Sequence, residues 1–101
     1  MKEQPIINIE AAKNVIATMK TEFDSHDFLT VYIITNTTSY LGLLKRFGSV
    51  ETAHQQIGLF LLNNAKFLGI SKKVEVESEN IFGNITSCGL WKREEHYYSL
   101  W

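Results

Sequence analysis

Apolar residues recur at intervals of three and four over the first two thirds of the chain, which is typical of amphipathic helices. From Ile9, one such stripe is formed by Ala12, Val15, Ile16, Met19 and Phe23. The clearest helical pattern covers residues 50–68, where Ser49 provides an N-cap and Gly69 a stop. Residues 9–69 are therefore predicted to be mainly helical.

The segment that follows residue 24 is less clear. Residues 28–36 are rich in Val, Ile, Thr and Tyr, which suits a strand as well as a buried helix. Ser25 is a suitable N-cap and Asp27 suits the first turn, so a helix is favoured over a strand. A further short helix, "YLGLLKRF", is expected between a cap at Thr38 or Ser39 and a C-terminal Gly48.

After Ile70 the hydrophobic period changes from that of a helix to two. The runs "KKVEVESE" and "ITSCGLW" predict two strands, and "NIFGN" between them predicts a turn at Gly83. Residues 70–93 are thus expected to form a β-hairpin that Phe82 and Trp91 anchor onto the helices. Ile81 and Phe82 near the turn either fold back on the core or form an exposed apolar knob.

The pattern as a whole predicts an α+β fold, a small helical bundle followed by a C-terminal β-hairpin. The expected single domain, 1–101, consists of a tail or edge strand (1–8), a helical part (9–69), the hairpin (70–93) and an aromatic arm (94–101). A helical core followed by a hairpin is also the general plan of winged helix-turn-helix domains, so the fold is expected to be winged-helix-like.

Charge and cysteine content narrow the class of protein. Ten basic and eleven acidic residues give a formal charge of −1, which argues against wholesale phosphate binding. The single cysteine, Cys88, excludes an intramolecular disulfide and suits a reducing compartment. The N-terminus lacks the apolar stretch of a signal peptide, and the longest apolar runs are too short to cross a bilayer. We therefore expect a cytoplasmic protein without a membrane partner.

Residues with catalytic potential do not form a motif. Ser25, His26 and Asp27 are consecutive, whereas the members of a catalytic triad converge from different parts of a fold. Cys88 lies in a predicted strand, where a lone cysteine is usually a small buried apolar group. No zinc-binding spacing and no phosphate-binding glycine loop occurs. The sequence predicts a non-enzyme without metal or cofactor, because an enzyme would need a pocket joining His26 or His54 to Cys88 or a carboxylate.

Gly58 lies inside the predicted long helix, where glycine costs about 1 kcal/mol relative to alanine. Close approach of a neighbouring helix would explain the glycine, and so would close approach of a ligand. The sequence favours the neighbouring helix.

DNA binding is one predicted function. The polar face of the long helix carries side chains able to read bases, and dibasic pairs flank the hairpin. The candidate DNA-binding residues are His54, Gln55, Gln56, Lys66, Lys72, Lys73, Lys92 and Arg93. This hypothesis requires the helix face and the dibasic pairs to share one surface. Against it, the hairpin carries Glu75, Glu77 and Glu79, which phosphate would repel.

Protein–protein interaction or homo-oligomerisation is the alternative function. Ile81 and Phe82 at the turn, with Tyr98 and Trp101 near the end of the chain, are an unusual apolar load for a small domain. Interfaces favour Tyr, Trp and Phe. This hypothesis requires an exposed apolar patch at the hairpin tip or in the C-terminal arm, and full burial of those side chains would oppose it.

Three segments together resemble a set of small uncharacterised bacterial proteins. These segments are "SHDF" (Ser25–Phe28), "TAHQQIGLFL" (Thr52–Leu61) and "SENIFGNITSCGLW" (Ser78–Trp91). The set shares an H-D-F start, a helix with A-H-x-x-I and an N-I-F-G…W region, and the similarity covers roughly residues 24–93. The resemblance implies a shared pattern formed by His26, Asp27, Phe28, His54, Ile57, Phe82, Gly83 and Trp91. It implies no activity, because none is assigned to those proteins.

Overall fold

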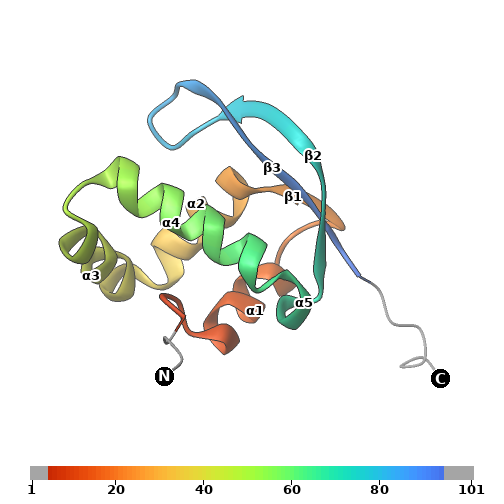
Figure 1. Ribbon diagram of the computed structural model, residues 1–101, viewed down its shortest axis with the longest axis horizontal. Coiled ribbons are helices and arrows are strands. Elements are labelled where there is room, and N and C mark those ends of the chain that lie inside the picture. Colours follow the sequence, from red (N-terminus) through yellow and green to blue (C-terminus); the bar gives the residue numbers. More distant parts are fainter. Residues whose placement is uncertain (1–4, 95–101) are drawn as a thin grey trace.

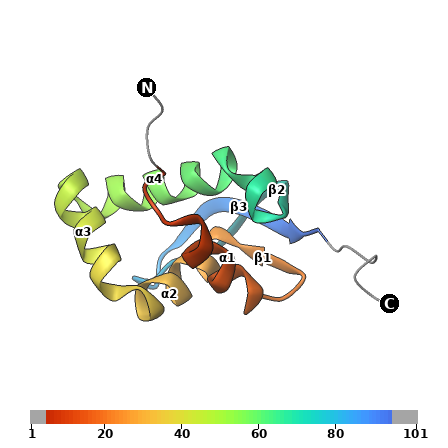
Figure 2. The ribbon, with the colours of Figure 1, turned by 90° about the horizontal axis from the view of Figure 1, so that it is seen from below.

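The structure, a computed structural model, describes residues 5–94 and has a mixed α+β architecture. Its helices are α1 (Ile9–Ala17), α2 (Ser25–Thr35), α3 (Thr37–Phe47), α4 (Val50–Asn63) and α5 (Ala65–Leu68). Its strands are β1 (Glu22–Asp24), β2 (Ile70–Glu79) and β3 (Ile85–Arg93). Helix α3 lies at one end of the molecule and α5 at the other, with α4 running between them (Figure 1 and Figure 2). The predicted α+β class is confirmed.

The strands form one antiparallel sheet in the order β1-β3-β2. The predicted hairpin of residues 70–93 is confirmed, and Gly83 in its turn has the left-handed φ of 83° that glycine tolerates best. The third strand was not predicted: Phe23 was assigned to the first helix, but α1 ends at Ala17. Phe23 instead pairs with Trp91 of β3 and is buried. The four-residue spacing from Met19 to Phe23 fits a helix face, but a buried apolar residue also fits an inward strand position. Pairing with β3 places Phe23 in a strand.

Residues 28–35 are helical, as favoured, but two predicted caps are wrong. Asp24, not Ser25, caps α2: its carboxylate accepts from the backbone N–H of Asp27, and the Asp27 carboxylate accepts from the backbone of Asp24. Helix α3 begins at Thr37 after Asn36, not after Thr38 or Ser39. The chain enters α2 one residue earlier, and α3 two or three residues earlier, than the residue types suggested.

The predicted long helix over residues 50–68 is two helices. It begins at the predicted Ser49 cap, whose hydroxyl accepts from the backbone of Thr52. Asn64 interrupts it with a non-helical backbone (φ −115°, ψ 13°), and its side-chain amide donates to the carbonyl of Phe60. The short α5 follows and ends at the predicted Gly69, which has a left-handed φ of 72°.

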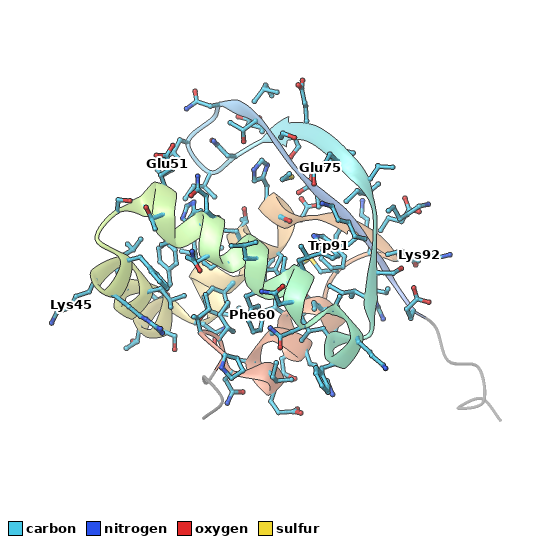
Figure 3. The ribbon with its side chains drawn as sticks, in the orientation of Figure 1. Lys45, Glu51, Phe60, Glu75, Trp91 and Lys92 are labelled. Carbon is cyan, nitrogen blue, oxygen red and sulfur yellow. The ribbon has the colours of Figure 1, made fainter. Side chains whose placement is uncertain are left out.

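One apolar core joins the helices to the sheet. Trp91, only 2% exposed, points from β3 toward the helices, whereas its neighbour Lys92 points away (Figure 3). The indole N–H of Trp91 donates to Oγ of Ser25 at 2.9 Å, which ties β3 to the start of α2. Trp91 therefore anchors the hairpin onto the helices, as predicted. Phe82, the other predicted anchor, is 60% exposed and does not enter this core.

The predictions for the two ends of the chain, an N-terminal tail or edge strand and a C-terminal aromatic arm, are only partly covered by the described residues. Residues 5–8 form no strand, although Ile7 is buried in the core. The rest of the predicted N-terminal segment and residues 95–101 of the predicted aromatic arm lie outside the described residues. Within residues 5–94, no helix combines the length and the apolar character that crossing a bilayer requires.

Candidate functional site

A cleft of about 830 Å³ lies between α4 and the β2–β3 hairpin, and we call it the α4–hairpin cleft. Helix α4 contributes Ile57 and Leu62 to one wall. The hairpin contributes Phe82 and Cys88 to the other, and Trp91 also lines the cleft. The hairpin curves over α4, so its inner face and the upper face of the helix look toward each other (Figure 1). Most of the lining surface is apolar.

Gly58 faces this cleft from the middle of α4. Among the described residues, no atom outside the local helix backbone lies within 4 Å of the place its Cβ would occupy. The favoured explanation, close approach of a neighbouring helix, is therefore wrong. The absence of a side chain at Gly58 leaves open space at this wall of the cleft.

Gly89 on β3 has the opposite surroundings. A Cβ at Gly89 would lie 3.3 Å from Nε1 of Trp91 and 3.4 Å from the Lys72 side chain. The absence of a side chain there lets the hairpin close tightly beside the indole. The two glycines thus shape the cleft in different ways, one by leaving room and the other by permitting contact.

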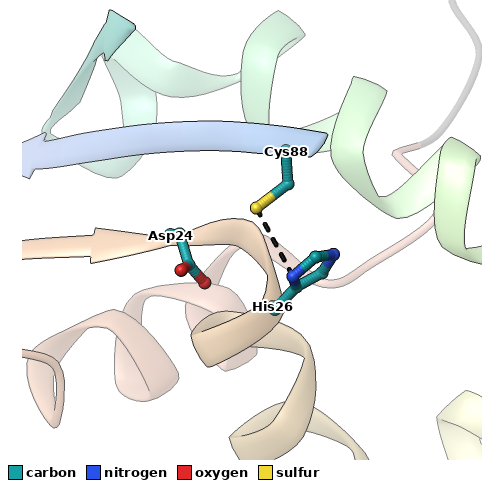
Figure 4. A group of neighbouring side chains, drawn as sticks. All are labelled: Asp24, His26 and Cys88. Atoms are coloured by element: carbon teal, nitrogen blue, oxygen red, sulfur yellow. Dashed lines mark hydrogen bonds between the residues drawn. The ribbon is translucent and has the colours of Figure 1, made fainter. Parts of the chain in front are cut away.

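A cluster of polar side chains, the His26–Cys88 cluster, consists of Asp24, His26, Ser78, Thr86 and Cys88. Nδ1 of His26 lies 2.6 Å from Oγ of Ser78 and 3.6 Å from Sγ of Cys88. Figure 4 shows the imidazole and the thiol pointing toward each other, with the Asp24 carboxylate close by. The other ring nitrogen, Nε2, lies 3.2 Å from Oγ1 of Thr86. Both ring nitrogens of His26 therefore have hydroxyl partners from the hairpin.

The fold assembles this cluster from distant segments. Asp24 ends β1, His26 lies in the first turn of α2, and Cys88 lies in β3. Pairing of β1 with β3 places Asp24 opposite Leu90, two residues from the cysteine. One ligating atom from each of Asp24, His26 and Cys88 lies within 4.8 Å of the others. The sequence prediction of no metal rested on spacing along the chain, and no local motif reveals this grouping.

His54 lines the same cleft from α4. Its Nε2 lies 2.7 Å from the hydroxyl of Tyr40, and its ring stacks on Phe82 with 6.1 Å between ring centroids. Burial lowers the pKa of His54, and the nearby charge of His26 lowers it further. His54 is thus a half-buried histidine that favours its neutral form.

Three of the eight predicted DNA-binding residues line the α4–hairpin cleft, and the other five do not. His54, Gln55 and Lys72 line the cleft, and Lys72 forms an ion pair with Glu75. Lys73 is the extra residue of a bulge and reaches Glu22 of β1 at 2.8 Å. The remaining four lie elsewhere: half-buried Gln56, exposed Lys66 on α5, outward-pointing Lys92, and Arg93, which donates to the carbonyl of Met19 at 2.8 Å. Two of the lysines are therefore already paired with carboxylates.

The predicted interaction residues are exposed where the structure describes them. Ile81 is 38% exposed and Phe82 is 60% exposed at the hairpin turn. Ile85, at the start of β3, is 64% exposed and extends this apolar surface. Tyr98 and Trp101 lie outside the described residues. The hairpin tip is thus exposed, although Phe82 also stacks on His54 of α4, so the structure combines the two alternatives that the sequence left open.

The condition that we set for an enzyme is also met, because one cleft joins His26 and His54 to Cys88 and Glu75. A comparison with protein-family models, curated proteins and solved structures gave no match. The resemblance to small bacterial proteins therefore stays a prediction, and the functional argument rests on the geometry of the cleft.

Proposed function

We propose that this chain is a non-enzymatic binding module that holds a small, predominantly apolar molecule in the α4–hairpin cleft. The observation that carries the proposal is the open space beside Gly58 in the middle of the cleft wall. A cleft of about 830 Å³ falls in the range of small-molecule sites, roughly 300–1,000 Å³. Such sites are mainly apolar and carry a few convergent polar groups, as this one does.

The charges around the cleft disfavour an anionic ligand, because Glu51 of α4 adds a carboxylate to the lining. Lys72 and Glu75 both line the cleft, and they pair with each other. The lowered pKa of His54 favours the uncharged imidazole, so this wall presents no fixed positive charge near neutral pH. The polar atoms of His26 and Cys88 offer hydrogen bonds at one part of an otherwise apolar surface. A molecule with an apolar body and one polar group matches this distribution.

The contacts of His26 support binding rather than nucleophilic catalysis. A general base for Cys88 needs a free ring nitrogen within hydrogen-bond reach of the thiol. Nδ1 of His26 lies 3.6 Å from Sγ, but it lies only 2.6 Å from the Ser78 hydroxyl. The group that contacts Nε2 is the Thr86 hydroxyl rather than a carboxylate. Ser78 therefore competes with the thiol for the nitrogen that would accept its proton.

Fluorescence of the neutral apolar dye N-phenyl-1-naphthylamine tests the proposal. The wild type is expected to enhance dye emission with one saturable site. Gly58→Leu fills the open space and is expected to weaken binding at least tenfold. Gly42→Leu is the matched control, because Gly42 is also a helical glycine without a described neighbour within 4 Å and lies outside the cleft. Equal binding by the two variants, or none by the wild type, overturns the proposal.

Protein interaction through the hairpin tip is a second candidate, favoured by the exposure of Ile81, Phe82 and Ile85. Scattered exposed apolar residues are ordinary, but a contiguous group of them marks a contact surface. Self-association is the simplest interaction of this kind, because it needs no second protein. Sedimentation velocity of the wild type and of Phe82→Ser over a range of concentrations tests it. A wild-type dimer that Phe82→Ser converts to monomer supports the interaction, and a wild-type monomer at all concentrations contradicts self-association.

DNA binding by a winged-helix-like domain is a third candidate. It is favoured by the position of the hairpin beside α4 and by Gln55 and Lys72 along one cleft. Fluorescence anisotropy of mixed-sequence duplex DNA at low and near-physiological salt tests it. Affinity that falls steeply with salt supports phosphate contacts. Absence of binding at low salt with tens of micromolar protein contradicts it. For all three candidates we propose a cytoplasmic location, on the basis of the single cysteine.

A further inference from the structure

We propose that Asp24, His26 and Cys88 form a zinc-binding site whose open coordination position faces the α4–hairpin cleft. The proposal does not depend on an apolar ligand, because it rests on the three side chains alone. Thiolate, imidazole and carboxylate are the three groups that bind Zn²⁺ in proteins. Three protein ligands with a fourth position left for water or another small ligand is the arrangement of open zinc sites.

The distance between the two strongest ligands fits a single zinc ion. Zinc–sulfur bonds of about 2.3 Å and zinc–nitrogen bonds of about 2.05 Å in a tetrahedron place the two atoms about 3.6 Å apart. Sγ of Cys88 and Nδ1 of His26 lie 3.6 Å apart. The two side chains thus have the spacing that zinc coordination requires without a change of backbone.

Asp24 is placed to complete the set. Its ligating oxygen lies within 4.8 Å of the other two ligand atoms, so closing around an ion needs a shift of about 1 Å. Oδ1 accepts the backbone N–H of Asp27 at 2.8 Å, which holds the carboxylate in position and leaves Oδ2 for the metal. Zinc ligands are commonly oriented by such additional hydrogen bonds.

Thr86 can hold His26 in the tautomer that metal binding needs. When Nε2 carries the hydrogen and donates to Oγ1 of Thr86 at 3.2 Å, the lone pair of Nδ1 points toward Cys88. A ligating histidine that donates its second N–H to an oxygen is typical of zinc sites. The Ser78 hydroxyl, 2.6 Å from Nδ1, can turn to donate to the thiolate instead. Metal binding displaces the thiol proton of Cys88 to solvent, so affinity is expected to rise with pH.

Isothermal titration calorimetry of chelator-treated, reduced protein with ZnCl₂ tests the proposal. We expect the full-length wild type to bind one zinc ion per chain at micromolar zinc concentrations. Cys88→Ser and His26→Gln are each expected to weaken binding at least tenfold. Asp24→Asn is also expected to weaken it, while asparagine retains the helix cap. His54→Gln, which changes the histidine in the cleft outside the cluster, is expected to bind as the wild type does.

Cobalt provides a signature that identifies the ligands. With CoCl₂ we expect a thiolate-to-cobalt charge-transfer band and the intense visible bands of a tetrahedral ion. Both are expected to disappear in Cys88→Ser and to persist in His54→Gln. Absence of stoichiometric zinc binding by the wild type overturns the proposal. Binding that Cys88→Ser and His26→Gln leave unchanged also overturns it, because the metal would then be held elsewhere.

Discussion

Sγ of Cys88 lies 3.6 Å from Nδ1 of His26, although 62 positions separate the two residues in the chain. Two contacts bring them together: the pairing of β1 with β3, and the hydrogen bond from Trp91 to Ser25. Because Ser25 precedes His26 and Trp91 follows Cys88 by three residues, this bond fixes both segments at once. The geometry of the cluster therefore depends both on this strand pairing and on the packing of Trp91.

Trp91→Phe is expected to destabilise the protein by about 1–3 kcal/mol, through lost volume and a Ser25 hydroxyl left without its donor. Phe67→Leu on α5, where Phe67 is 70% exposed, is the control and is expected to change stability by less than about 0.5 kcal/mol. Urea unfolding monitored by circular dichroism measures both. Equal effects of the two substitutions would show that Trp91 does not anchor the hairpin.

Asp24→Ala is expected to reduce the free energy of unfolding by about 1 kcal/mol, because the α2 cap loses the acceptor for the Asp27 backbone N–H. Asp24→Asn keeps an acceptor oxygen and is expected to lose much less. Ser25, which the residue types suggested as the cap, is the first residue of the helix. Chemical denaturation of the two Asp24 variants compares them directly, and identical losses would contradict capping.

Gly58→Ala is expected to stabilise the protein by about 0.5–1 kcal/mol, because alanine favours the helix and its Cβ has room. Gly42→Ala in α3 is expected to give a similar gain for the same reason. Gly83→Ala is expected to destabilise, since its φ of 83° disfavours a side chain. Thermal melting ranks the three variants. A loss of stability in Gly58→Ala would mean that the wall of the cleft is closed.

His54 is expected to make the fold less stable in acid. Its folded pKa lies below the ordinary histidine value of 6.5, so the unfolded chain takes up the proton first as pH falls. The contribution of His54 to stability is therefore complete above pH 6.5 and is lost as pH falls from there toward the folded pKa of His54. Urea midpoints at several pH values measure the loss, and His54→Gln is expected to reduce it. An unchanged pH dependence in that variant would contradict this origin.

The coupling of the two histidines has its own test. The charge of His26 is the second cause, after burial, of the lowered pKa of His54. His26→Gln is therefore expected to raise the pKa of His54, measured by NMR titration of its imidazole carbon-bound protons. Thr30→Gln, on the exposed side of α2, is the control. A His54 pKa that does not move in His26→Gln would mean that burial alone sets it.

The helices and the hairpin were predictable because their signals are local. The period changes at Ile70, and Gly48, Gly69 and Gly83 each occupy the left-handed positions that end helices or make turns. Strand β1 was not predictable, because three residues carry too little periodicity and its partner lies far along the chain. The same limit applies to helix ends, where Asp24 and Ser25 are both acceptable caps.

The candidate site was less predictable than the fold. His26 and Cys88 were both considered, but only their separation along the chain could be judged from the sequence. Asp24, Ser78 and Thr86 were not singled out, since a lone hydroxyl or carboxylate gives no signal. Gly58 was the one informative residue, because a glycine inside a helix needs a reason. The sequence could not show whether a helix packs against Gly58, and the open space around the residue in the structure shows that none does.

The most direct test of ligand binding in the cleft is an NMR titration of ¹⁵N-labelled protein with N-phenyl-1-naphthylamine. We expect saturable shifts at the backbone amides of Gly58 and Gly89 and at the indole N–H of Trp91, because all three residues line the cleft. Shifts confined to exposed apolar residues such as Ile34 or Phe67, or no shifts at saturating dye, would contradict it.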